Sequence, residues 1–127
     1  MNEKKVVIRA GGAPAPEVPL SQAIKANGLI FCSGVVPIDP LTGKLVSGGI
    51  EAQAKQVLEN IGAVLKEAGS SMDKVVKTTV FLVNQKDFQG MNAVYAKYFP
   101  IDPPARATVQ AGLMIDALVE IEAIAIA

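Results

Sequence analysis

The segment Val119–Ile126 constrains the fold most, because its side chains alternate in character with a period of two. A strand places successive side chains on opposite faces, so this pattern predicts a β-strand with one wholly apolar face. The two faces are Val119, Ile121, Ala123 and Ala125 on one side and Glu120, Glu122, Ile124 and Ile126 on the other. The apolar face of such a strand requires a second layer of structure over it.

Two segments carry apolar residues at helical spacing. In the first, 50–68, apolar side chains recur at intervals of three and four residues, and Gly69 supplies a left-handed stop. In the second, 88–99, aromatic and methionine side chains recur at helical intervals until Pro100, which cannot extend a helix. We expect both segments to be helices with one buried face.

The remaining strands are marked by β-branched residues and turn signals. Asn27-Gly28 tolerates positive φ at both positions and predicts the two-residue turn of a β-hairpin. The segment 75–83 is rich in valine and threonine and predicts a central strand, which its apolar content indicates is buried on both faces. The full set of expected strands is 6–8, 23–26, 29–33, 75–83, 106–110 and 119–126.

The resulting order, β-β-β-α-β-α-β-β, predicts an α+β fold with a single mixed β-sheet and two helices on one face. We expect residues 1–127 to form a single domain, because this length supports one core and not two. Half of the residues are apolar and only 19% are charged. The uncovered face of the sheet therefore predicts burial in an oligomer.

Residue types that are absent exclude several classes of function. The chain has no histidine and one cysteine, so imidazole catalysis, histidine or thiolate metal sites and internal disulfides are excluded; we expect no metal and no cofactor. Cys32 lies in an apolar strand, where we expect an inert thiol. Zero net charge without a basic tract indicates no nucleic-acid partner, and no apolar run is long enough to imply a membrane partner. The N-terminal residues do not resemble a signal peptide, which favours the cytoplasm.

Arg106, one of only two arginines, begins a strand-like segment directly after two prolines. A planar, permanently charged guanidinium binds a carboxylate through two parallel hydrogen bonds, which a flexible lysine does less well. Arg106 is therefore the candidate for holding a ligand carboxylate. The alternative is a structural ion pair between Arg106 and a glutamate across the sheet.

Five motifs in one order along nearly the whole chain together resemble the RidA/YjgF family of enamine/imine deaminases. They are FCSGVVPIDP at 31–40, VKTTVFL at 76–82, DF with MNAVY at 87–95, PAR at 104–106 and EIEAIA at 120–125. The resemblance implies a chorismate-mutase-like fold and a homotrimer whose sheets form a barrel, with a ligand cleft at each subunit boundary. The implied reaction is hydrolytic deamination of reactive 2-enamine/2-imine intermediates, such as 2-aminoacrylate and 2-aminocrotonate, to 2-keto acids and ammonia.

The same resemblance implies roles for individual residues. Arg106 would clamp the substrate carboxylate, and Glu120 would orient or deprotonate the attacking water and pass a proton to the departing ammonia. Glu122, two residues further along the strand, would have a structural or pairing role. Asn92, on the second helix, is a weaker candidate, with a purely structural role as its alternative. The predicted substrate-binding residues beside Arg106 are Ser33, Gly34, Thr108, Leu20 and Asn92.

The chain departs from the family pattern at three positions near the proposed site. Leu20 stands where the family commonly has tyrosine, Val35 where it often has glutamine, and Thr108 where cysteine is frequent. These changes make the pocket more apolar and favour a second hypothesis, a non-catalytic module that binds small 2-keto or amino acids. A third hypothesis, an endoribonuclease or translation inhibitor, is disfavoured by the zero net charge and the lack of histidine.

Overall fold

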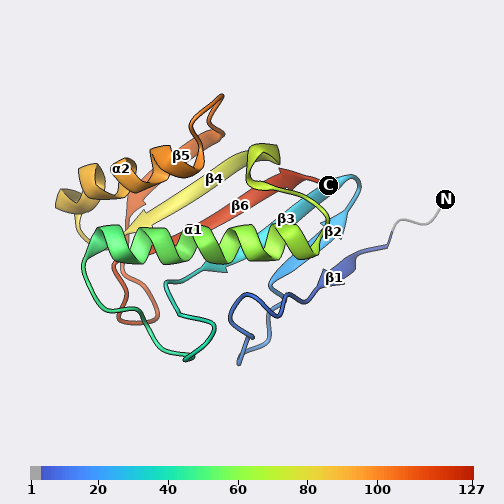
Figure 1. Cartoon of the computed structure of the whole chain (residues 1–127), viewed down its shortest axis with the longest axis horizontal. Coiled ribbons are helices and arrows are strands. Elements are labelled where there is room, and N and C mark those ends of the chain that lie inside the picture. Colours follow the sequence, from blue (N-terminus) through green and yellow to red (C-terminus); the bar gives the residue numbers. More distant parts are fainter. Residues whose placement is uncertain (1–3) are drawn as a thin grey trace.

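Strand β6 (Val119–Ile126) lies inside a six-stranded mixed sheet, between β3 and β4 (Figure 1). The structure is a computed structural model that describes residues 4–127. The strand order is β1-β2-β3-β6-β4-β5; β4 and β5 run parallel, and the other neighbouring pairs are antiparallel. The elements that accompany β6 are β1 (Val6–Ile8), β2 (Ala23–Ala26), β3 (Leu29–Val35), α1 (Ile50–Glu67), η1 (Met72–Lys74), β4 (Val75–Leu82), η2 (Gln85–Asp87), α2 (Phe88–Tyr98) and β5 (Ala105–Gln110).

The predicted fold class and order of the main elements are confirmed, with shifts of one or two residues at their ends. Asn27 and Gly28 have φ values of 52° and 75°, as the predicted hairpin turn requires, and Gly69 follows α1 with φ of 82°. The two short 3₁₀ helices, η1 and η2, were not predicted. Each is three residues long, which is too short to show a hydrophobic period.

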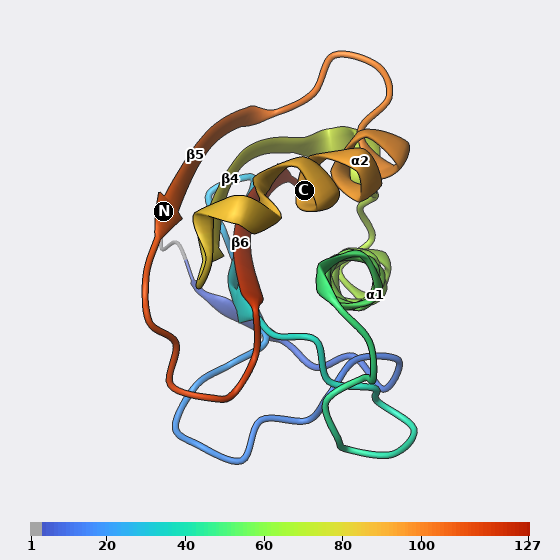
Figure 2. The ribbon, with the colours of Figure 1, turned by 90° about the vertical axis from the view of Figure 1, so that its left-hand side faces the viewer.

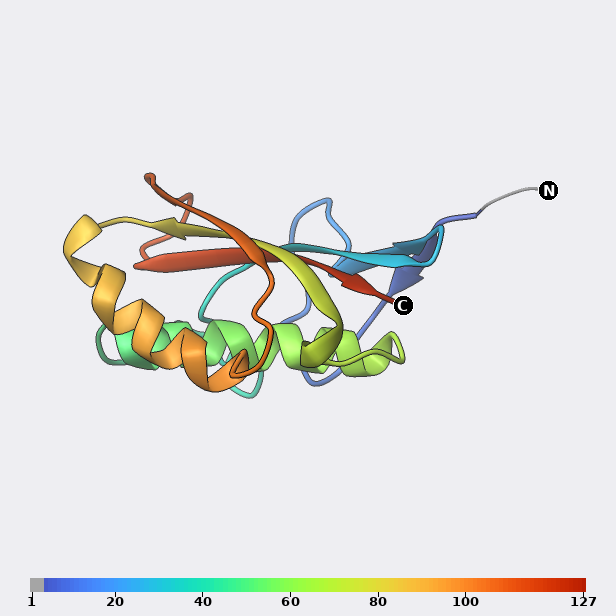
Figure 3. The same ribbon diagram turned by 90° about the horizontal axis from the view of Figure 1, so that it is seen from above.

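Both helices cover the same face of the sheet (Figures 2 and 3). α1 packs on β6 and β3 and against α2. Its Leu58, Ile61 and Leu65 are completely buried, as is Ile121 of β6. Burying each such side chain contributes about 1.5–3 kcal/mol to folding. Among the helices of residues 4–127, none has both the length and the apolar character needed to cross a bilayer.

The opposite face of the sheet carries no helix (Figure 3). Phe31 and Ile126 are 42% and 49% exposed there, and Glu122 is exposed. The prediction that 75–83 is buried on both faces is wrong for the single chain, because Thr78, Val80 and Leu82 are buried while Lys77 is exposed. The helices cover only one side of β4, so its β-branched residues reflect strand geometry and not two covered faces.

Candidate functional site

Arg106 lies on β5, the strand at one edge of the sheet, and its side chain faces α2. In the parallel ladder Arg106 is opposite Thr78 of β4, which is buried beneath the helices. Arg106 itself is half-buried. The two prolines before β5 favour an extended chain that enters the edge of the sheet. The guanidinium therefore lies between the sheet edge and the second helix, partly shielded from solvent.

Three residues of α2 hold this guanidinium. Arg106 Nη1 donates a hydrogen bond of 2.8 Å to Asn92 Oδ1, and the guanidinium carbon lies 4.8 Å from the centre of the Tyr95 ring and 5.7 Å from that of Phe88. Residues at i, i+4 and i+7 lie on one face of a helix, so one face of α2 supplies all three contacts. The ring contacts stabilise the cation without neutralising it. The hydrogen bond to Asn92 uses one edge of the guanidinium fork.

Tyr95 also ties this helix face to the sheet. It is 5% exposed, and its hydroxyl lies 2.7 Å from Thr78 Oγ1 in a buried hydrogen bond. Burial raises the pKa of Tyr95, and the Thr78 hydrogen bond and the Arg106 charge oppose that rise. Sequence reasoning did not select Tyr95, Phe88 or Thr78 as site residues. The spacing of Phe88, Asn92 and Tyr95 on one helix face was the available signal.

Glu120 lies on the opposite face of the sheet, where no helix covers it. Its carboxylate lies directly over Gly34 of β3: a Cβ added at Gly34 would overlap that carboxylate and come within 3.0 Å of Glu120 Cδ. The structure thus brings together two of the predicted site residues. Burial raises the pKa of Glu120, and the neighbouring charge of Glu122 raises it further. A raised pKa suits a group that must both accept and return a proton.

Arg106 and Glu120 do not meet within one chain. The ladders place Glu120 opposite Phe81 of β4, and Arg106 opposite Thr78. Thr78 faces the helices, whereas Glu120 shares the uncovered face with Glu122, so the sheet separates the two groups. The alternative of an ion pair between Arg106 and a glutamate of β6 is therefore wrong for the single chain. A site that uses both groups needs a second chain.

Thr108 lies on the same face of β5 as Arg106, two residues further on. Its hydroxyl is buried, with no hydrogen-bond partner among residues 4–127. A pocket of about 300 Å³ borders it, with Leu82, Gln85, Phe88, Thr108, Val109 and Gln110 as its lining. Phe88 both lines this pocket and contacts Arg106, so the pocket adjoins the guanidinium. A ligand here would offer the Thr108 hydroxyl the partner that it lacks.

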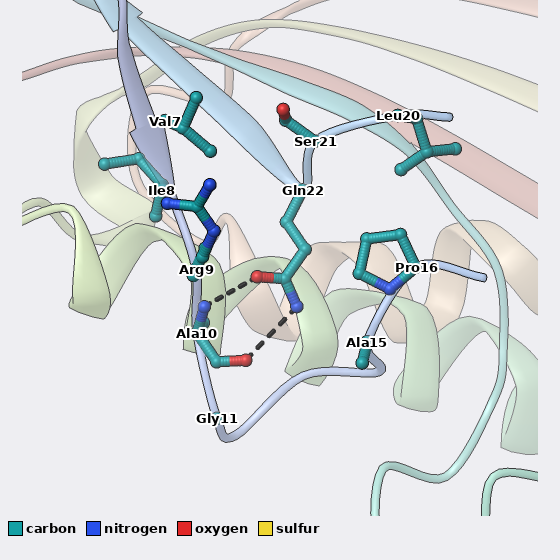
Figure 4. A pocket seen from close by; sticks show the side chains of 10 residues that line it. All are labelled: Val7, Ile8, Arg9, Ala10, Gly11, Ala15, Pro16, Leu20, Ser21 and Gln22. Atoms are coloured by element: carbon teal, nitrogen blue, oxygen red, sulfur yellow. Dashed lines mark hydrogen bonds between the residues drawn. The ribbon is translucent and has the colours of Figure 1, made fainter. Parts of the chain in front are cut away.

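Within the single chain, Ser33 and Leu20 do not meet Arg106. The Ser33 hydroxyl donates to the Ser21 carbonyl at 2.6 Å, which anchors the loop before β2. Leu20, 48% exposed, lines a separate pocket of about 430 Å³ between β1 and that loop (Figure 4). There the Gln22 amide hydrogen-bonds both backbone groups of Ala10. Neither Arg106 nor Glu120 lines this pocket, so a single chain does not bring Leu20 to either group.

Cys32 is buried, and burial raises the pKa of its thiol to about 11. At neutral pH a thiol of that pKa is almost entirely protonated, and the protonated form is not nucleophilic. The predicted burial of Cys32 is confirmed, and the inertness of its thiol stays a prediction. The charged groups that can take part in a reaction are therefore Arg106, with its α2 contacts, on one face of the sheet and Glu120, over Gly34, on the other.

Comparisons with known proteins show the family to which the chain belongs. The family model described as Endoribonuclease L-PSP matches residues 10–127. The chain is 51% identical over 123 residues to "Reactive Intermediate Deaminase A, chloroplastic" of Arabidopsis thaliana, covering 96% of this chain and 66% of that protein. It is 47% identical over 121 residues to the mouse "2-iminobutanoate/2-iminopropanoate deaminase", covering 94% of this chain and 90% of that protein.

A solved structure agrees with the fold as well. The structure of E. coli TdcF with bound serine matches with a TM-score of 0.92 at 35% sequence identity, over 97% of this chain and 99% of that one. Family model, relatives and solved structure thus agree along almost the whole chain, which confirms the resemblance carried by the five motifs. The chain belongs to the Endoribonuclease L-PSP family, in which its relatives include RidA-type deaminases.

Proposed function

We propose that this protein hydrolyses reactive 2-imino acids, in equilibrium with 2-enamines such as 2-aminoacrylate and 2-aminocrotonate, to 2-keto acids and ammonia. The observation that carries the proposal is the state of Arg106: a half-buried guanidinium, held by Asn92 and two aromatic rings, with N–H groups left for a carboxylate. The names of the Arabidopsis and mouse relatives support this reaction. The bound serine of TdcF, which carries a carboxylate, supports this ligand class.

The reaction suits a chain without histidine, because an imine carbon is already electrophilic. Arg106 would hold the substrate carboxylate by a charge-assisted pair, worth roughly 1.5–3 kcal/mol. Glu120 would take a proton from the water as its oxygen bonds to the imine carbon and pass that proton to the imine nitrogen, which gives a carbinolamine. It would then take the carbinolamine hydroxyl proton and pass it to the nitrogen as the C=O bond forms, the C–N bond breaks and ammonia leaves. Positioning and one proton carrier are all that the reaction requires of the protein.

The separation of Arg106 and Glu120 by the sheet leads us to propose a homotrimer in which each site takes Arg106 from one chain and Glu120 from its neighbour. The uncovered face supports association, because Phe31, Val109 and Ile126 are each more than 40% exposed. Leu20 and Ser33 would reach the substrate only in such an assembly. We place the protein in the cytoplasm, where pyridoxal enzymes release such imines; the Arabidopsis relative is named as chloroplastic.

Two alternatives are separable by experiment. The apolar Leu20 and Val35 and the partnerless Thr108 hydroxyl favour a binding module for 2-keto or amino acids, which would bind 2-oxobutyrate and release no ammonia. The family description names an endoribonuclease. That activity would need RNA to bind a chain of zero net charge, so we place it behind the other two.

The test generates 2-iminobutanoate with threonine dehydratase and lets semicarbazide compete for it. The wild type should divert the imine to 2-oxobutyrate, and Arg106→Ala should abolish this, with Arg106→Lys recovering little because an ammonium lacks the planar fork. Lys97→Ala, which removes an exposed positive charge from α2, is the control and should behave as the wild type. An inactive wild type would overturn the deaminase proposal. An active Arg106→Ala would overturn the role of Arg106.

A further inference from the structure

The side chain that orients Arg106 is an amide and not an acid. Arg106 makes one side-chain hydrogen bond among residues 4–127, from Nη1 to Asn92 Oδ1 at 2.8 Å. No carboxylate in that part of the chain lies within ion-pair distance of the guanidinium. Arginines held inside proteins are commonly paired with aspartate or glutamate, which binds both edges of the fork. Within the single chain the positive charge is held in place and remains uncompensated.

The residues around Asn92 are tied to the sheet and to one another. Tyr95, one helical turn further along α2, is fixed by its buried hydrogen bond to Thr78 and by the Phe99 ring, whose centre lies 4.7 Å away. Thr78 is opposite Arg106 in the β4–β5 ladder, so the Tyr95–Thr78 hydrogen bond joins α2 to the strand beside the arginine. A long side chain held this way loses less rotamer freedom when a ligand binds.

We propose that Asn92 is a positioning residue whose neutrality is functional: it orients the Arg106 guanidinium through one hydrogen bond while leaving the full positive charge to a substrate carboxylate. An aspartate at this position has nearly the same shape, but it would accept two hydrogen bonds and form an internal ion pair. The substrate would then have to displace that pair. Asn92 therefore acts through Arg106 and need not contact substrate. This inference rests on the proposed function for Arg106.

The decisive variant is Asn92→Asp, with Gln89→Glu as the matched control. Gln89 is exposed on the same helix, so Gln89→Glu adds the same charge to α2 and keeps the Arg106–Asn92 hydrogen bond. Asn92→Asp should weaken the binding of 2-oxobutyrate, measured by calorimetry, and raise KM for the imine, both by about tenfold or more, with a smaller change in kcat. It should also raise Tm, because the new pair stabilises the ligand-free fold. Arg106→Ala in the Asn92→Asp background should remove that gain in Tm.

The outcomes separate this inference from the proposed function. If the wild type binds 2-oxobutyrate but releases no ammonia, the deaminase proposal fails, and the binding comparison still decides the role of Asn92. If Asn92→Asp binds 2-oxobutyrate as tightly as the wild type, or no more weakly than Gln89→Glu, the inference is overturned whatever the turnover. A wild type that neither binds 2-oxobutyrate nor turns over the imine would overturn both, and if it turns over the imine without binding 2-oxobutyrate, the KM comparison decides the role of Asn92.

Discussion

Gly34→Ala probes the placement of Glu120 with the smallest change available. The added methyl would occupy the space that the Glu120 carboxylate fills, and the Glu120 side chain, which is flexible at its far end, would have to move. Gly34 has no positive φ, so alanine adds no backbone strain there. The variant therefore tests the position of one carboxylate without removing it.

The expected magnitudes follow from that contact. Alanine restricts the unfolded chain and adds about 0.4–1 kcal/mol of stability. Pushing the Glu120 side chain about 30° off its rotamer costs about 0.5–1.5 kcal/mol. The two effects nearly cancel, so the free energy of unfolding should stay within about 1 kcal/mol and Tm within about 4 °C of the wild type. A general base moved by about 1 Å loses on the order of 100-fold in kcat.

The assay compares kcat for 2-iminobutanoate, Tm by calorimetry and the oligomeric state by light scattering for Gly34→Ala, Glu120→Gln and the wild type. Gly112→Ala is the control, because a Cβ there meets no atom within 4 Å. We expect Gly34→Ala to lose activity nearly as far as Glu120→Gln while Tm and oligomeric state stay unchanged. Activity within about threefold of the wild type would show that the position of this carboxylate does not matter, and would refute the role given to Glu120.

Two further predictions concern the shared site and its pH dependence. Arg106→Ala and Glu120→Gln chains, refolded together in equal amounts, should regain about a quarter of the wild-type activity. The reason is that about one in four subunit boundaries would pair an intact Arg106 with an intact Glu120. A mixture as inactive as each variant alone would contradict a site shared between chains. Glu122→Gln should move the acidic limb of the kcat/KM profile to lower pH, because the Glu122 charge, after burial, holds the pKa of Glu120 above its usual value. The folded state holds the Glu120 proton more tightly than the unfolded chain, so the free energy of unfolding should fall as pH rises through the raised pKa. Denaturation curves of Glu120→Gln at several pH values should show a flatter dependence. If the acidic limb of kcat/KM does not move and the pH dependence of stability does not change, the raised pKa does not belong to Glu120.

The sequence alone predicted the local elements well. The alternation in Val119–Ile126 identifies a strand with one face against the core, and the structure leaves Val119, Ile121, Ala123 and Ala125 at most 2% exposed. Asn27-Gly28 predicted the hairpin, and the helical period predicted α1 to within one residue. These signals are local, since backbone geometry converts a short sequence period directly into a buried face.

The tertiary structure alone decided which functional groups meet. A period of two divides each strand into two faces, but it does not say which face of β5 matches which face of β6. Strand order and register set that relation, and they depend on contacts between residues far apart in the chain. The sequence could therefore nominate Arg106 and Glu120 but not show that the sheet separates them. Likewise, the Asn92 hydrogen bond to Arg106 and the place of Glu120 over Gly34 exist only because packing brings α2 to β5 and β6 to β3.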